Sequence, residues 1–191
     1  MSESRDRILG TAAELHASDG LDAVSMRAVA SRLGVTAMSL YRHFHNKEEL
    51  IEAISESGFS LLVTYLKRPT RKRSKPLAMI EHFLAFALDE PRLYELMFLR
   101  RRGAQRTFPR DFAAHRSPTF DLLRVAVEGE MKAGRMRRDD ALETALTIWT
   151  HAHGLISMYT LGRFGDDADA FRALYARSMR RLFKGIEGVR R

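Results

Sequence analysis

The apolar residues of this chain recur three and four positions apart along most of its length. No segment alternates apolar and polar residues as a half-exposed strand does, so the periodicity favours helices throughout. The pattern predicts helices over residues 5–18, 26–33, 36–44, 47–66, 76–88, 91–98, 118–133, 140–164 and 167–185. We therefore predict an all-α fold with about nine helices.

Two of these predicted helices are short and are separated by a tight turn. Met26, Val29 and Ala30 lie on one side of the first, and Gly34 ends it, because glycine adopts the left-handed conformation without a steric penalty. Thr36 is the predicted cap of the second, which would turn Leu40 and Phe44 inward. This arrangement is typical of a helix-turn-helix, whose second helix fits the DNA major groove.

The outer surface of the second short helix is rich in hydrogen-bond donors. Ser39, Tyr41, Arg42 and His43 follow Thr36 in the sequence, and Lys47 opens the next helix. No acidic residue occurs between Ala23 and Asn46. Helix–glycine–helix corners occur in many all-helical proteins, but this set of donors can bind phosphates and base edges. The segment therefore predicts an interface with double-stranded DNA.

The segment GVTAMSLYRHFHNKEEL, residues 34–50, resembles the signature of TetR-type transcriptional regulators, which places Tyr, His, Phe and Lys at these intervals. The resemblance extends over the first third of the chain, including RDRILGTAAELHASDG at residues 5–20. It implies an all-helical homodimer with an amino-terminal DNA-reading domain and a larger domain that binds a small effector. It also implies that base edges are read by Thr36, Ala37, Met38 and Ser39, and that the DNA backbone or grooves are contacted by Ser25, Arg27, Tyr41, His43 and Lys47.

Two of the residues at the base-reading positions are apolar. Ala37 and Met38 replace the polar residues often found there, so they can contact thymine methyl groups or read DNA shape. We therefore expect Arg27 to carry much of the direct readout, as a bidentate partner for guanine.

The charge is concentrated outside this segment. The net charge is +8, but residues 1–47 hold six basic and five acidic side chains, whereas residues 67–138 hold eighteen and eight. We predict a DNA-binding domain over residues 1–46, a connecting helix over 47–66, and an effector-binding and dimerisation domain over 67–191. The basic segments at 67–75 and 100–106 can be solvated loops, or can contact DNA or ligand.

The last two predicted helices suggest how two copies pair. Both are long and amphipathic, and nothing downstream remains to cover them, although burial within one monomer is the alternative. The resemblance implies that they form a four-helix bundle in a homodimer, and Trp149–Phe164 resembles a carboxyl-terminal subclass in which Trp, His and Gly recur in this order. A two-fold dimer would place its recognition helices about one DNA turn apart, or a multiple of it, on a palindromic operator.

Aromatic residues dominate the predicted effector domain. The candidate ligand-binding residues are Phe83, Phe86, Met97, Phe98, Phe112, Phe120, Trp149 and His153. Such a set at helical spacing also fits a plain hydrophobic core. With the family resemblance, we expect a small, largely apolar effector that releases a repressor from its operator.

Composition excludes several other classes. The chain has no cysteine, no run of the ~20 apolar residues that a membrane span needs, and no signal-peptide core, so we expect a cytoplasmic protein with no membrane partner. His43 and His45, like His151 and His153, are two positions apart and point to different sides of a helix. We predict no catalytic residue, metal or cofactor. The alternative function is a DNA-independent helical protein that binds small molecules.

Overall fold

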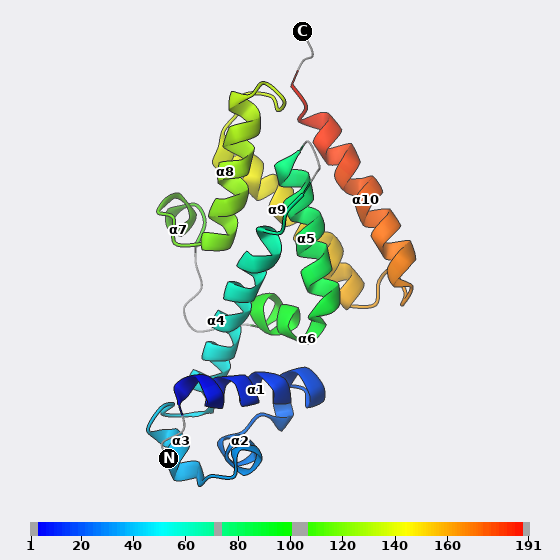
Figure 1. Ribbon diagram of the computed structural model, residues 1–191. Helices are drawn as coiled ribbons and strands as arrows, with labels where there is room; N and C mark the ends of the chain where they lie inside the picture. Colours follow the sequence, from blue (N-terminus) through cyan, green and yellow to red (C-terminus); the bar gives the residue numbers. More distant parts are fainter. Residues whose placement is uncertain (1–3, 71–73, 101–106, 189–191) are drawn as a thin grey trace. The chain divides into compact units, whose positions relative to one another are not determined.

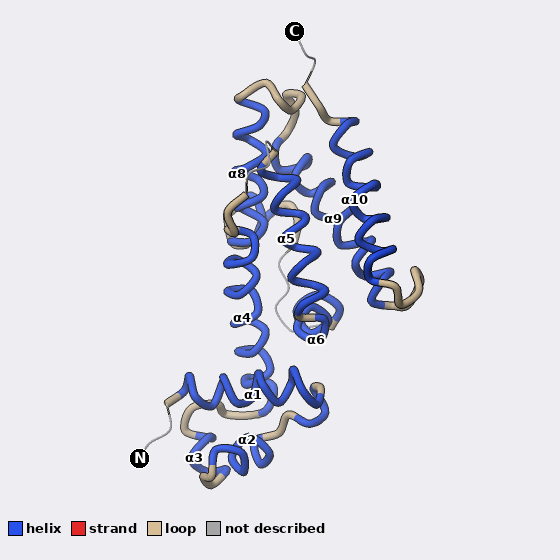
Figure 2. Tube along the Cα trace, turned by 45° about the vertical axis from the view of Figure 1, so that its right-hand side comes forward, coloured by secondary structure: helices blue, strands red, loops and turns tan. Residues whose placement is uncertain are grey.

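The computed structural model describes residues 4–70, 74–100 and 107–188, and these fold into two compact units. The first unit comprises Met1–Leu61 and Glu90–Arg101, and the second comprises Leu62–Asp89 and Arg102–Arg191. Ten α-helices and no strand occur in the described residues, which confirms the all-α fold (Figures 1 and 2). The only extended pairing in this part of the chain is an isolated bridge between Met136 and Glu187.

The first unit is built around three amino-terminal helices. Its elements are α1 (Arg5–Asp19), the 3₁₀ turn η1 (Leu21–Ala23), α2 (Met26–Leu33), α3 (Ala37–Tyr41), most of α4 (Lys47–Leu66), α6 (Pro91–Tyr94) and the π-helical turn η2 (Glu95–Leu99). One hydrophobic core joins them, with Ile8, Val29, Leu40, Phe44, Leu50 and Ile54 fully buried. Burial of this apolar surface is the main force that holds the short helices in place.

The second unit is a bundle of longer helices. It contains the end of α4, α5 (Lys75–Asp89), α7 (Arg110–Ala113), α8 (Pro118–Lys132), α9 (Ala141–Thr160) and α10 (Ala168–Gly185). Helix α9 packs against α5, α8 and α10 (Figure 1). The Tyr175 hydroxyl donates a hydrogen bond to the Ile80 carbonyl at 3.1 Å, which ties α10 to α5 within the core.

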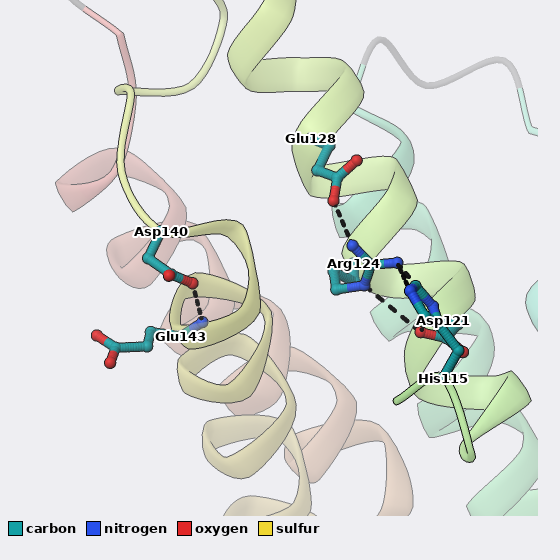
Figure 3. A network of polar contacts seen from close by, with 6 residues as sticks. All are labelled: His115, Asp121, Arg124, Glu128, Asp140 and Glu143. Atoms are coloured by element: carbon teal, nitrogen blue, oxygen red, sulfur yellow. Dashed lines mark hydrogen bonds and ion pairs between the residues drawn. The ribbon is translucent and has the colours of Figure 1, made fainter. Parts of the chain in front are cut away.

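Side-chain caps fix the beginnings of the long helices. Asn46 accepts a hydrogen bond from the Glu49 amide at 2.8 Å, and Asp140 accepts one from the Glu143 amide at 2.9 Å (Figure 3). Asp167 caps α10 in the same way. These side chains satisfy amide groups that the first turn of a helix leaves unpaired, so the sequence predicts these three starts correctly.

A network of ion pairs fixes the start of α8 (Figure 3). Asp121 is 3.0 Å from His115 Nδ1 and 3.4 Å from Arg124 Nε, and Arg124 also pairs with Glu128 one turn later. His115 has a left-handed backbone with φ of 56°. The network therefore holds the loop before α8 against the first two turns of that helix.

One observed helix was not predicted, one predicted helix changes type, and the predicted helices over 36–44 and 140–164 end earlier, at Tyr41 and Thr160. Helix α7 was missed, because its four residues are too few to show a helical period. The predicted helix over 91–98 is α-helical only to Tyr94 and then widens into η2, where the Arg100 amide bonds to the Glu95 carbonyl five residues earlier. The compact first unit also includes Glu90–Arg101, and the functional domain boundary at residues 66–67 stays a prediction.

Candidate nucleic-acid interface

The turn between α2 and α3 is fixed by backbone geometry. Ser25 Oγ accepts a hydrogen bond from the Ala28 amide at 3.1 Å and caps α2. Gly34 ends α2 in the left-handed conformation, with φ of 68° and ψ of 31°, and the Val35 amide then donates to the Ala30 carbonyl at 3.0 Å. This bonding pattern is a Schellman motif, which reverses the chain at a defined angle. The direction of α3 is therefore set by Gly34.

Helix α3 has one buried and one exposed side. Leu40 and Phe44 are fully buried, and the Arg5 guanidinium lies 4.6 Å above the Phe44 ring. On the other side Met38 is 75% exposed and Tyr41 is 47% exposed. Large apolar or aromatic side chains with this exposure have no role in the core of the unit. They form an outer face of a size that suits a DNA groove.

The amino-terminal turn of α3 differs in detail from the prediction. Thr36 has the extended backbone of a cap residue, but its side chain makes no capping hydrogen bond. Instead the Ser39 hydroxyl donates to the Thr36 carbonyl at 2.6 Å. The exposed Thr36 hydroxyl is thus not used by the helix, while Ala37 and Ser39 are half-buried and Met38 projects from the turn.

Five polar side chains around α3 are without an internal partner. Within the described residues, no side-chain hydrogen bond or ion pair forms at Arg27, Tyr41, Arg42, His43 or Lys47. Arg27, Tyr41 and Arg42 are exposed, and His43 and Lys47 are half-buried. These donors come from the start of α2, from the end of α3 and the residues after it, and from the start of α4. Such donors can bind phosphate oxygens or base edges without first breaking an internal bond.

Glu49, in the first turn of α4, is already bonded to His45. Glu49 Oε2 lies 2.7 Å from both the backbone amide and Nδ1 of His45. The amide hydrogen bond, followed by the imidazole contact, lowers the pKa of Glu49. The Glu49 charge is therefore engaged within the α3–α4 junction, where it stabilises the positions of the neighbouring donors.

Residues 90–100 brace the first unit in a way that the sequence analysis missed. The Arg92 guanidinium donates to the Ala17 carbonyl at 2.7 Å, and His16 Nε2 is 3.1 Å from the Arg92 carbonyl. Burial lowers the pKa of His16, which keeps its ring neutral. The only signal in the sequence is that His16 lies on the apolar side of the helix predicted over residues 5–18. A single histidine does not show which distant residue it contacts.

The residues predicted to bind an effector fall into two groups. Phe83, Phe86 and Phe120 are fully buried in the second unit, and Phe112 packs edge-on against Phe120 at 4.9 Å. Trp149 stacks on Phe83 at 4.7 Å, and His153 contacts both rings. Met97 and Phe98 lie in the first unit, where Phe98 packs against Phe59 and Tyr94. The set is therefore not one cluster, and its role in ligand binding stays a prediction.

Among the described residues of the second unit, one cavity has a volume of about 650 Å³ and another a volume of about 290 Å³. None of the eight predicted ligand-binding residues lines either cavity. The larger one is lined in part by Lys67, Arg68 and Lys75 from the first predicted basic segment. Residues 71–73 of that segment and 101–106 of the second lie outside the described residues.

The described residues contain no cluster of three or more His, Asp or Glu side chains that could hold a metal ion. His151 instead lies 2.8 Å from the Ser178 hydroxyl. None of the helices in the described part of the chain has the length and apolar character of a membrane span.

Two protein-family sequence profiles match the chain. The profile described as "Bacterial regulatory proteins, tetR family" matches residues 8–54, and "Tetracyclin repressor-like, C-terminal domain" matches residues 77–182. The chain is 25% identical over 188 residues to the "Uncharacterized HTH-type transcriptional regulator Rv0681" of Mycobacterium tuberculosis, covering 96% of this chain and 82% of the relative. It is 32% identical over 100 residues to the "HTH-type transcriptional activator FasR" of Mycolicibacterium smegmatis, covering 50% and 46%. A structure of a protein with unknown function from Rhodococcus sp. RHA1 superimposes with a TM-score of 0.78 at 24% identity, covering 95% and 94% of the two chains.

Proposed function

Because this chain belongs to the TetR family of bacterial transcriptional regulators, we propose that it binds a palindromic operator as a homodimer and leaves the operator when a small effector binds. The observation that carries the proposal is the exposed side of α3, where Tyr41 and Met38 project outward next to side chains without internal partners. A DNA-independent protein that binds small molecules would not require exposed hydrogen-bond donors around α3. The site of action would be the cytoplasm, where the DNA lies.

The specific roles proposed for individual residues follow from their positions. Arg27 is exposed on the first turn of α2, and we assign it base readout. Met38 and Ala37 would contact thymine methyl groups, with Thr36 and Ser39 offering hydroxyl groups beside them. Ser25, Tyr41, His43 and Lys47 would contact phosphates, which fix the register of the protein on DNA without reading sequence.

The proposed dimer contact uses the uncharged outer side of α9. No Asp, Glu, Lys or Arg occurs between Glu143 and Arg163, which is unusual for a surface helix. One exposed stripe runs along the helix and its end: Thr147, Thr150, Gly154, Met158 and Leu161. Met158 is 47% exposed and Leu161 is 67% exposed. A stripe of this kind is suited to packing against its own symmetry mate, with α10 flanking it. The subclass resemblance of Trp149–Phe164 stays a prediction.

The proposed response to ligand uses α4, which continues from the first unit into the second. An effector bound in the second unit would shift the carboxyl-terminal end of α4 and so change the spacing of the two recognition helices. The effector must bind the DNA-incompetent state more tightly, because equal affinity for both states shifts no population. We propose repression, although one relative that matches half of this chain is named as an activator.

Selection of genomic DNA fragments by the purified protein tests this proposal. We expect enrichment of a short palindrome with two half-sites spaced by about one DNA turn or a multiple of it. A gel-shift assay with the selected fragment should then show one dimer bound. In a separate transcription assay, adding the protein should lower transcription from a promoter that contains this fragment. Fragments without shared sequence would contradict the proposal, and increased transcription would replace repression with activation.

A further inference from the structure

The larger cavity of the second unit lies between the end of α4, α5 and α8, and its volume is about 650 Å³. From α5 its wall takes Lys75, Ala78, Met79 and His82, and from α8 it takes Leu122, Val125 and Ala126. Residues three and four positions apart share one side of a helix, so one side of each helix faces the cavity. A space of this volume falls within the range of small-molecule sites.

One part of the cavity wall is apolar and open. Val125 is 58% exposed, and Met79, Leu122 and Ala126, which also line the cavity, are half-buried. A methyl group added at Gly129, one turn further along α8, would meet no atom within 4 Å. Leu66 and Ala78 close the wall behind with 4% and 1% exposure. The cavity thus offers an apolar strip that a ligand can cover.

The other part of the wall carries positive charge. Lys67, Arg68 and Lys75 line it, against the single carboxylate of Glu130. Arg135 already binds both oxygens of Glu130, at 2.8 and 3.0 Å, and Glu130 is only 4% exposed. Within the described residues neither Lys67 nor Lys75 has an ion-pair partner, and the Arg68 guanidinium lies 3.5 Å above the Tyr65 ring. Among the described residues, Lys67 and Lys75 are therefore left without an ion-pair partner, and Arg68 is held by Tyr65.

We infer that this cavity binds an amphipathic organic anion, with its acidic head at Lys67, Arg68 and Lys75 and its apolar body along Val125 and Ala126. An acidic head would supply the ion-pair partner that Lys67 and Lys75 lack among the described residues, whereas a neutral ligand would not supply one and a cation would be repelled. This inference rests on the proposed function, because the anion would be the effector, and it adds an acidic head to the largely apolar effector expected from the sequence.

Calorimetric titration of the full chain with three ten-carbon probes tests the inference. Sodium decanoate, decan-1-ol and decylammonium chloride share one apolar body and differ only in the head. We expect decanoate to bind at least about tenfold more tightly than decanol, because the charged head gains an interaction with the lysines. Decylammonium should show no measurable binding. Equal affinities for decanoate and decanol would overturn the inference.

Variants locate the site. The double variant Lys67→Gln/Lys75→Gln should weaken decanoate binding about tenfold and leave decanol binding unchanged. Ala126→Trp should abolish binding of both, since the indole would occupy the apolar strip. The matched control is Arg172→Gln, which removes a positive charge from the exposed side of α10. Wild-type decanoate affinity in the double variant or in Ala126→Trp would overturn the inference.

The same samples separate this inference from the proposed function. Each variant is assayed for binding to the selected operator, with and without decanoate. Operator binding by a wild-type protein that binds no decanoate would overturn the cavity assignment and leave the regulator intact. Decanoate binding by a protein that binds no DNA would keep the cavity and overturn the regulator.

Discussion

Gly58 in α4 lies directly against Met97 in η2, and the two approach so closely that a side chain at position 58 would have to displace Met97 and Leu93. A Cβ placed there would be 2.5 Å from Met97 Sδ and 2.9 Å from Leu93 Cδ1. Glycine in a helix interior normally lowers stability, so its presence here is explained by the close approach. The contact fixes η2 against α4 within the first unit.

Replacing Gly58 with alanine should lower the free energy of unfolding by about 1–2 kcal/mol, because overpacking outweighs the gain in helix propensity. The matched control is Gly10→Ala in α1, where an added methyl group meets nothing within 4 Å. That variant should instead gain about 0.5–1 kcal/mol. Urea unfolding followed by circular dichroism measures both, and equal gains at the two positions would show that the contact is loose.

Local signals in the sequence predict the fold better than they predict partners between segments. Gly34, Asn46, Asp140 and Asp167 act through the nearest turn of chain, so their roles follow from neighbouring residues. The same holds for the two sides of α3, where Leu40 is buried and Met38 is exposed.

Contacts between distant segments could not be predicted in this way. The bond between His16 and the Arg92 carbonyl joins residues 76 positions apart, and no periodic pattern marks it. The cavity charges come from the basic segment at 67–75, for which the sequence left a solvated loop, a DNA contact and a ligand contact open, whereas the candidate ligand-binding residues were mostly large aromatic ones. Most of those aromatic residues pack in the hydrophobic cores. Large rings fill a close-packed core well, so their spacing in the sequence does not distinguish a core from a ligand site.

The stability of the second unit should depend on the protonation of His153. Burial beside Phe83 and Trp149 lowers the pKa of His153 to about 4, from 6.5 for the free side chain. As the pH falls, His153 is therefore protonated at a higher pH in the unfolded chain than in the folded chain. The resulting stability is complete above pH 6.5 and is lost as the pH falls towards 4. The contribution of His153 to the free energy of unfolding should fall by roughly 3 kcal/mol.

Urea unfolding of the wild type and of His153→Leu between pH 7.5 and pH 4.5 checks this expectation. The wild type should lose more stability than the variant over that range, so the difference between them should shrink on acidification. Parallel losses in the two proteins would show that His153 titrates as a normal histidine.

The uncharged side of α9 should be essential for pairing. In Met158→Glu each protomer would carry a carboxylate into the proposed dimer contact, and an unpaired buried charge costs about 3–5 kcal/mol. We expect dissociation to monomers at micromolar concentration in analytical ultracentrifugation, with a matching loss of operator binding. Ala114→Glu, at an exposed position outside α9 and α10, is the control and should leave the dimer intact. A stable dimer of Met158→Glu would place the contact elsewhere.

The proposed phosphate contacts should weaken DNA binding without changing its sequence preference. Tyr41→Phe, His43→Ala and Lys47→Ala each remove a donor that has no internal partner, so the folded state should be unaffected. Titrations with operator and with random DNA should show similar losses for each variant. For Lys47→Ala the salt dependence of binding should also fall by about one counterion. A changed base preference would instead assign the residue to readout.

Arg27 should behave in the opposite way, because a bidentate contact with guanine discriminates among base pairs. Arg27→Ala should weaken operator binding by about 1–3 kcal/mol and relax the preference at one base pair in each half-site. The same change should have a smaller effect on random DNA, where that guanine is usually absent. Arg27→Lys is the sharper test, since it keeps the charge but loses the two parallel donors. If the Arg27→Lys variant retains full operator affinity and base preference, Arg27 contacts a phosphate. The readout must then come from the side chains of α3 alone.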